Sequence, residues 1–221
     1  MVQTHPSSDI PTFPPGELWS EEPPLESYRH LKQLILLLTC LERYWQKRTD
    51  FFAGANMSVY YSTRQRKSED MRGPDFFVVL DTQRRERKSW VVWEEDGKYP
   101  NFIIEVLSDS TAQNDRGLKK QLYQDVWRTP DYFWFDPNSL EFKGFQLMHG
   151  EYEELQPNER GWLWSNELQL YLGILDEKLR FFTPEGDLVL TPEEEADAQR
   201  QRNAILREKL QELGVNPDEI I

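Results

Sequence analysis

The sequence predicts an α/β domain, because apolar residues recur at helical spacing near both ends of the chain and form short buried runs between them. From residue 27 to about 47, apolar residues stand three and four positions apart, which is typical of a helix that packs on a core. The runs at 76–80 and 102–107 are short and almost wholly apolar, as in strands buried on both faces.

The chain divides into three parts. Residues 1–26 contain six prolines and few apolar anchors, and we expect an extended proline-rich arm. Residues 27–190 form the domain, and residues 191–221 form a C-terminal helical extension. In that extension Thr191 can cap, Pro192 suits the first helical position, and Glu194 completes a capping box. The leucines that follow form a stripe too short to establish a coiled coil, so docking on the domain and on a second copy both stay open.

Within the domain we expect the following elements in order. They are a bent strand or two short strands at 51–61, strands at 76–80, 90–93 and 102–107, a helix at 115–127, a strand at 132–136, a hairpin at 142–155, a covering segment at 162–171, and a second hairpin at 179–190. The helix at 115–127 is expected to bury the face that carries Leu118, Leu122, Tyr123 and Val126.

The charge and cysteine content exclude several classes of protein. The net charge is −13, but the ends carry most of it, since residues 31–190 hold 26 acids and 21 bases, a net of −5. The net charge counts against a generic nucleic-acid coat protein, which would be basic, and the mildly negative core weakens this objection without removing it. The single cysteine, Cys40, excludes an intrachain disulfide and a cysteine-rich zinc site. No signal peptide or apolar run of about 18 residues is present, so we expect a soluble, cytoplasmic protein without a membrane span.

Glu105 lies in the middle of the apolar run at 102–107. A carboxylate buried in a strand is costly unless a basic side chain, a shared proton or a metal ion compensates it. A second acid, Asp75, opens the strand at 76–80, and the two can converge if their strands are neighbours. Two carboxylates form a hard oxygen site suited to Mg²⁺. From these residues alone, a structural ion pair and a functional site both stay open.

The order of residues around these acids resembles the PD-(D/E)xK nuclease superfamily. The pieces are Gly73-Pro74-Asp75, the stretch from Asn101 to Thr111 around Glu105, Asp115-Arg116-Gly117-Leu118-Lys119, Tyr123, and the stretch from Pro130 to Pro137. More closely, the chain resembles the Uma-type family described as "putative restriction endonuclease", a domain of unknown function widespread in bacteria. The resemblance covers about residues 28–150.

The resemblance implies a restriction-endonuclease-like fold, a mixed β-sheet flanked by helices. It further implies a Mg²⁺-dependent (or Mn²⁺-dependent) endonuclease that acts on DNA, with Asp75 and Glu105 as metal ligands. The superfamily places a lysine two residues after the acid, where this chain has Leu107. In this family the lysine comes from the next helix, which points to Lys119, with Lys120 as its neighbour. A solvated helix face is the alternative interpretation of this lysine pair.

Other residues give weaker signals. Glu26 could be a further upstream acid of the site or a surface acid in the arm. The basic loops at 64–72, which include Arg72, and at 84–88 could hold phosphate backbone or be solvated hairpin tips. His30 and the two other histidines show no ligand spacing, and we expect them to be structural or exposed.

Three functions are weighed. The first is a metal-dependent endonuclease in which Asp75 and Glu105 bind metal, Lys119 assists the attacking water, and Arg72 and Lys120 contact DNA. The second is a catalytically inactive nuclease-like interaction or regulatory module, which Leu107 and the acidic charge favour. The third, a hydrolase using the two acids as general acid and base, lacks a substrate signature. A homodimer would suit a nuclease that cuts both strands, but the sequence does not establish one.

Overall fold

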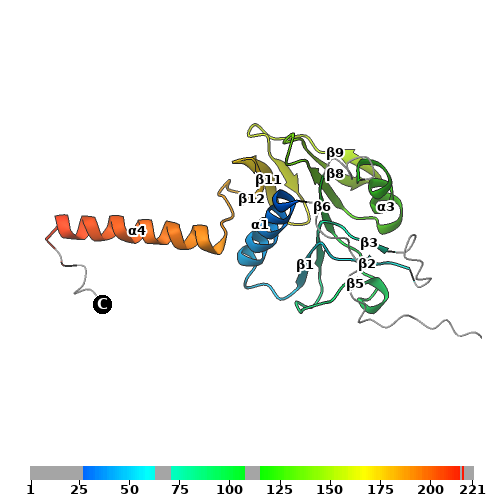
Figure 1. Ribbon diagram of the computed structural model, residues 1–221, viewed down its shortest axis with the longest axis horizontal. Coiled ribbons are helices and arrows are strands. Elements are labelled where there is room, and N and C mark those ends of the chain that lie inside the picture. Colours follow the sequence, from blue (N-terminus) through cyan, green and yellow to red (C-terminus); the bar gives the residue numbers. More distant parts are fainter. Residues whose placement is uncertain (1–26, 63–70, 108–114, 215, 217–221) are drawn as a thin grey trace, which may run out of the picture.

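The computed structural model describes residues 27–62, 71–107, 115–214 and 216, with the side chains of 115 and 116 excepted (Figure 1). The predicted N-terminal arm, Glu26 and most of the basic loop at 64–72 lie outside the described residues. So do Ser108 to Thr111, which belong to the stretch that carries the family resemblance.

A mixed six-stranded sheet forms the centre of the domain, in the order β1-β4-β6-β7-β8-β9. The pair β6 and β7 is parallel and every other neighbouring pair in this sheet is antiparallel. The predicted α/β fold with a mixed sheet is therefore confirmed. The strands are β1 (Phe51–Ala55), β4 (Phe76–Leu80), β6 (Phe102–Val106), β7 (Asp131–Phe135), β8 (Phe142–Met148) and β9 (Glu151–Glu154).

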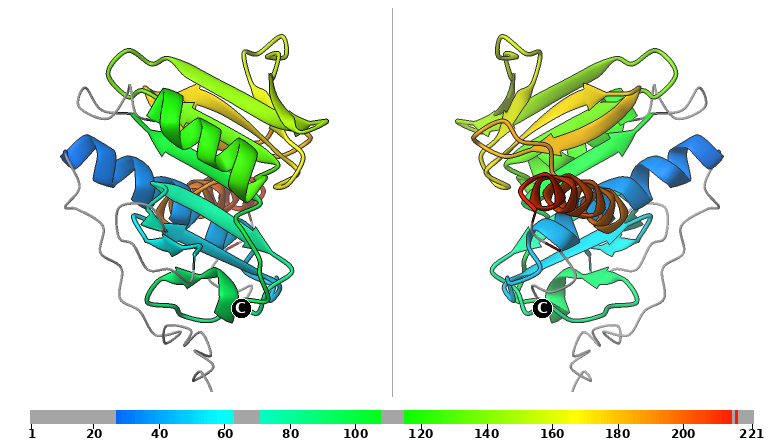
Figure 2. Two further views of the ribbon diagram at one scale, coloured as in Figure 1. Left: turned by 90° about the vertical axis from the view of Figure 1, so that its right-hand side faces the viewer. Right: turned by 90° about the vertical axis from the view of Figure 1, so that its left-hand side faces the viewer.

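Different elements cover the two faces of this sheet (Figures 1 and 2). One face packs on α1 (Tyr28–Tyr44) and on a second sheet of β10 (Leu163–Ser165), β11 (Leu170–Leu175) and β12 (Lys178–Phe182). The other face packs on a continuous helical segment made of η2 (Asp115–Lys119), α3 (Lys120–Leu122) and η3 (Tyr123–Trp127). A small third sheet contains β2 (Val59–Tyr60), β3 (Met71–Arg72) and β5 (Trp90–Val91).

Alternation along β6 sends its side chains to both layers, as the period of two in a strand requires. Phe102, Ile104 and Val106 are buried in the layer with α1, while Ile103 and Leu107 are buried in the layer with Tyr123. Each such buried side chain stabilises the fold by about 1.5–3 kcal/mol relative to exposure. The apolar run is thus explained by burial on both faces, and Glu105 belongs to the face under the helical segment.

Three predicted details are wrong. The strand expected at 90–93 ends at Val91, because a 3₁₀ turn, η1 (Val92–Glu94), follows it. The second hairpin was predicted at 179–190, but it is formed by β11 and β12. Its turn contains Asp176 and Glu177, both at positive φ. The segment at 188–190 contributes only an isolated bridge between Phe182 and Leu188.

The third wrong prediction concerns which face of the helical segment is buried. Leu118 and Val126 are exposed, whereas Tyr123 and Trp127 are buried. Residues 115–119 and 123–127 are π-helical. The wider turn of a π-helix, with its i→i+5 hydrogen bonds, brings residues four apart closer to one line than the 3.6-residue period assumed from the sequence.

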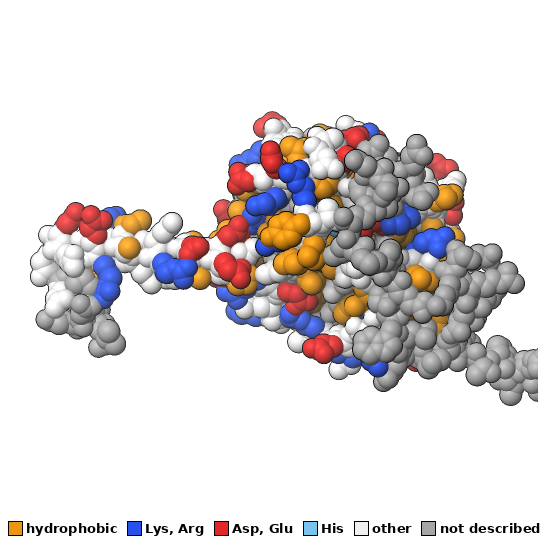
Figure 3. Space-filling view, viewed as in Figure 1, with side chains coloured by type: hydrophobic (Ala, Val, Ile, Leu, Met, Phe, Trp, Pro, Cys, Tyr) orange, Lys and Arg blue, Asp and Glu red, His pale blue; other side chains and the backbone are white. Residues whose placement is uncertain are grey.

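The C-terminal helix α4 (Pro192–Glu212) projects away from the domain (Figure 1). Its predicted capping box between Thr191 and Glu194 is confirmed, and Arg180 and Arg43 hold Glu194 and Glu195 in its first turn. No α4 residue is buried, and Figure 3 shows its charged and apolar side chains on the surface. In the described chain, α4 is therefore fixed to the domain near its start and does not dock along it.

Candidate active site

The strands β4 and β6 bring the two predicted carboxylates together. Phe76 is paired with Ile104, and continuing this antiparallel register by one residue sets Asp75 opposite Glu105. The backbone N–H of Val106 donates to Oδ2 of Asp75 at 2.7 Å, which holds Asp75 against the end of β6. The adjacency that the sequence argument required is confirmed.

Lys119 reaches the same place from the helical segment. Its Nζ lies 2.9 Å from Oε2 of Glu105, whose side chain is completely buried, while the Lys119 side chain keeps 21% of its surface exposed. The ammonium compensates the buried carboxylate, and its partial exposure leaves it within reach of solvent. The three residues predicted for the site are therefore in one place.

Tyr123 also belongs to this site, although the sequence analysis placed it on the buried face of the helix and in the family motif without giving it a role there. Its hydroxyl donates to Oε1 of Glu105 at 2.6 Å, inside the protein. The two oxygens of Glu105 therefore have different partners, an ammonium and a phenol. In the sequence, the spacing of four residues between Lys119 and Tyr123 could have indicated that the two side chains share a face. In the structure both residues lie in π-helical segments. Such π-helical insertions are frequent at functional sites.

Leu107, at the usual lysine position, is buried in the layer under the helical segment. Glu105 and Leu107 are two residues apart on one strand, so they belong to the same face. A lysine from the helix above that face can therefore approach Glu105 without occupying position 107. The geometry explains how an apolar residue at 107 is compatible with a lysine at the carboxylates.

His30 was expected to be structural or exposed, and its contact with Asp75 was missed. It lies in the first turn of α1, is 7% exposed, and places Nε2 3.2 Å from Oδ1 of Asp75. Burial alone would raise the pKa of Asp75, but His30, the Lys119 charge and the Val106 N–H together hold it below its usual range. Asp75 is thus kept in its anionic form, the form that binds cations.

The two residues expected to contact DNA lie apart from this group of contacts. Lys120 places its Nζ over the ring of Phe145 at 3.5 Å, and partial burial lowers its pKa. Arg72 lies on β3 in the small third sheet and donates to its neighbour's carbonyl. In the loop at 84–88, Arg84 pairs with Glu42, and both Arg85 and Arg87 pair with Glu95. These arginines are engaged within the protein.

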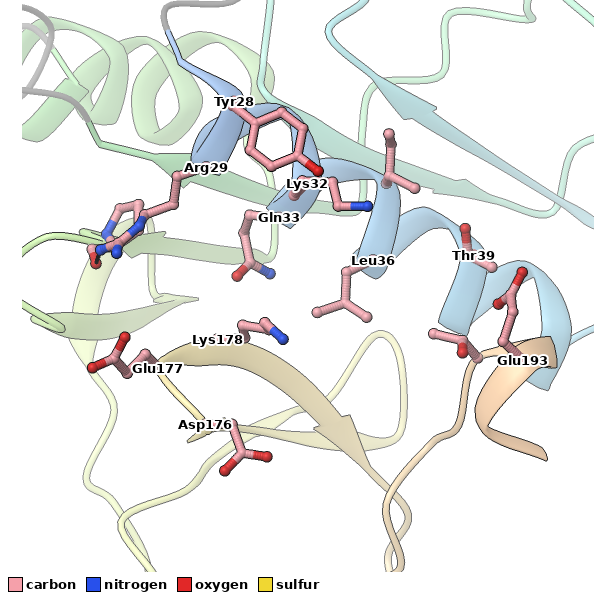
Figure 4. A pocket seen from close by; sticks show the side chains of 13 residues that line it. Tyr28, Arg29, Lys32, Gln33, Leu36, Thr39, Asp176, Glu177, Lys178 and Glu193 are labelled. Atoms are coloured by element: carbon pink, nitrogen blue, oxygen red, sulfur yellow. Dashed lines mark hydrogen bonds between the residues drawn. The ribbon is translucent and has the colours of Figure 1, made fainter. Parts of the chain in front are cut away.

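A groove of about 550 Å³ lies elsewhere, between α1, β12 and the start of α4 (Figure 4). Gln33 on its wall exchanges two hydrogen bonds with the backbone of Leu179, and Arg29 donates to the carbonyl of Pro137. Its polar groups therefore hold the domain's layers together. Neither Asp75 nor Glu105 lines this groove.

The residues present fit a hard divalent cation. Asp75 and Glu105 offer four carboxylate oxygens, and a carboxylate oxygen can accept from more than one partner. Among the described residues, no group of three or more His, Cys, Asp or Glu side chains is arranged to hold a metal. Mg²⁺ suits such a sparse set because it keeps several waters and needs only one or two carboxylates besides a phosphate.

A family model places the chain among putative restriction endonucleases. The model of the family Uma2, described as "Putative restriction endonuclease", matches residues 9–174. A crystal structure of a putative nuclease belonging to DUF820, from Anabaena variabilis ATCC 29413, has 12% identity and a TM-score of 0.48. That match covers 66% of this chain and 76% of the other. No curated protein matches the chain. No helix in the described part of the chain is long and apolar enough to cross a bilayer.

Proposed function

Because the chain belongs to the Uma2 family of putative restriction endonucleases, we propose that it is a Mg²⁺-dependent endonuclease that hydrolyses DNA phosphodiester bonds. The observation that carries the proposal is the contact of Lys119 with Glu105 at 2.9 Å, beside Asp75. Two carboxylates and a lysine are the residue types that a metal-dependent phosphodiesterase would use, with the lysine here supplied by a helix.

Asp75 and Glu105 would hold the cation in this site. When bound, Mg²⁺ polarises a phosphoryl oxygen, lowers the pKa of an attacking water and stabilises the leaving oxygen. Mn²⁺ would serve in the same way. The Tyr123 hydroxyl donates to Oε1 of Glu105, which would restrain rotation of the carboxylate when its other oxygen binds the cation.

Lys119 would assist the attacking water. Its ammonium donates to Glu105 and its side chain keeps 21% of its surface exposed, so the positive charge would orient a water or offset charge that develops on the phosphate. Arg72 and Lys120 would contact DNA outside the scissile phosphate. A homodimer, with one site for each strand, and a cytoplasmic location belong to the same proposal.

The test is cleavage of plasmid DNA with Mg²⁺ or Mn²⁺ by the wild type, by Glu105→Gln and by Glu154→Gln. Glu105→Gln keeps the shape of the side chain but removes the charge, and we expect it to abolish cleavage. Glu154→Gln removes an exposed carboxylate that pairs with Lys143 on β8, and we expect cleavage to persist. Equal inactivity of wild type and Glu105→Gln with both metals, on linear, supercoiled and single-stranded DNA, would favour the inactive module that Leu107 suggests.

A further inference from the structure

The polar side chain of His30 is buried, and burying its ring nitrogens without hydrogen-bond partners costs free energy. Its backbone N–H donates to Ser27, the N-cap of α1, so the residue is fixed in the first turn of that helix. Its Nδ1 is buried and makes no hydrogen bond with any described residue. An unsatisfied buried nitrogen of this kind costs about 1–3 kcal/mol, so the position of His30 is not explained by packing alone.

The polar contact of this ring is directed at Asp75. Nε2 lies 3.2 Å from Oδ1, within hydrogen-bond distance although off the ideal direction. The other oxygen, Oδ2, accepts the N–H of Val106 at 2.7 Å. Two groups from two different elements, α1 and β6, thus restrain the two oxygens of one carboxylate. Together they fix the plane of that carboxylate beside Glu105.

We propose that His30 is a positioning residue for Asp75, holding its carboxylate in the orientation in which it binds a divalent cation. The inference rests on the proposed function, since it concerns the cation of that site. A carboxylate oxygen that accepts one hydrogen bond still has a lone pair for a metal. A ligand that is already oriented loses less conformational freedom on binding, and loss of such outer contacts typically weakens metal binding by 10–100-fold.

The test measures Mn²⁺ affinity without DNA, by isothermal titration, for the wild type, His30→Ala and His30→Gln. We expect His30→Ala to weaken binding by about 10–100-fold. His30→Gln should recover part of the loss, because its amide N–H can donate at a similar reach. In Mn²⁺ spin-echo spectra of the wild type we expect no coupling to a directly bound nitrogen, since His30 acts through Asp75.

Gln33→Ala is the matched control. Gln33 is buried on the same face of α1, one turn later, but its side chain binds the backbone of Leu179 and not the site. The variant should lower the free energy of unfolding and leave Mn²⁺ affinity unchanged, which separates positioning from general support of α1.

Three results overturn the inference. If His30→Ala binds Mn²⁺ as tightly as the wild type, His30 does not position Asp75, and the proposed function is untouched. If the spectra show a bound nitrogen that His30→Ala removes, His30 is itself a ligand. If the wild type binds no Mn²⁺ at all, the proposed function fails and the inference fails with it.

Discussion

Glu105 on β6 and Asp131 on β7 are both completely buried carboxylates on neighbouring parallel strands, yet their partners are of different kinds. Glu105 meets an ammonium from Lys119 and the hydroxyl of Tyr123. Asp131 is paired with Phe102, which lies three residues before Glu105 on β6. The two carboxylates are therefore about 10 Å apart along the strands. Oδ2 of Asp131 accepts the Ser165 hydroxyl at 2.6 Å and the Glu167 N–H at 3.0 Å.

The charge of the partners decides what each carboxylate can do. No cation faces Asp131 among its described contacts, and burial raises its pKa to about 6. The pKa of Asp75, beside Lys119 and His30, is instead held below its usual range. Asp131 joins the six-stranded sheet to β10 in the second sheet, so its contacts are structural. A buried carboxylate in this fold becomes a candidate metal ligand only where a cation keeps it ionised.

The largest expected effect is on Lys119. Lys119→Met keeps the length and apolar stem of the side chain but removes the ammonium from Glu105. A donor aimed at developing charge is typically worth 10²–10³ in rate, so we expect plasmid cleavage with Mg²⁺ to slow by about 10²–10³-fold. Lys143→Met, which removes a lysine that pairs with exposed Glu154, is the control and should cleave normally. Cleavage by Lys119→Met at the wild-type rate would contradict the role of Lys119.

The next effect is on the pH dependence of stability, to which Asp131 and Asp75 contribute with opposite sign. Folded Asp131 binds its proton near pH 6, but the unfolded chain does so near pH 3.8. Between these values the folded state holds more protons, so Asp131 makes the free energy of unfolding decrease as the pH rises from 4 to 6, by about 2 kcal/mol. Asp75 acts in the opposite sense, because its lowered pKa makes stability fall only below about pH 4.

Asp131→Asn tests this difference. The variant cannot titrate, so the part of the pH dependence due to Asp131 should disappear between pH 4 and 6, as measured by urea unfolding at several pH values. The comparison uses the difference between variant and wild type, because other groups such as Glu167 also titrate in this range. Parallel curves for the two proteins would show that Asp131 is not the group responsible.

From the residues and the family resemblance, the sequence predicted the α/β fold, the acids on two neighbouring strands and the lysine on the next helix. It could do so because apolar runs, capping residues and motif order are local signals. The partners of Asp75 and Asp131 could not be predicted, because they come from segments remote in the sequence. His30 was missed for the same reason, being 45 residues from Asp75 in a helix that packs on another layer. The buried face of the helical segment was predicted wrongly because π-helical geometry leaves no simple period in the sequence.

The smallest effect compares two hydroxyls, one at each carboxylate. Tyr123→Phe removes the donor to Oε1 of Glu105, and Ser165→Ala removes a donor to Oδ2 of Asp131. Each leaves a buried carboxylate oxygen with one partner fewer, so each should lower the free energy of unfolding by about 1–3 kcal/mol. Only Tyr123→Phe should also slow plasmid cleavage, because only Glu105 belongs to the proposed site. If Ser165→Ala slowed cleavage as much at equal stability, the two ends of the strand pair would not be functionally separate.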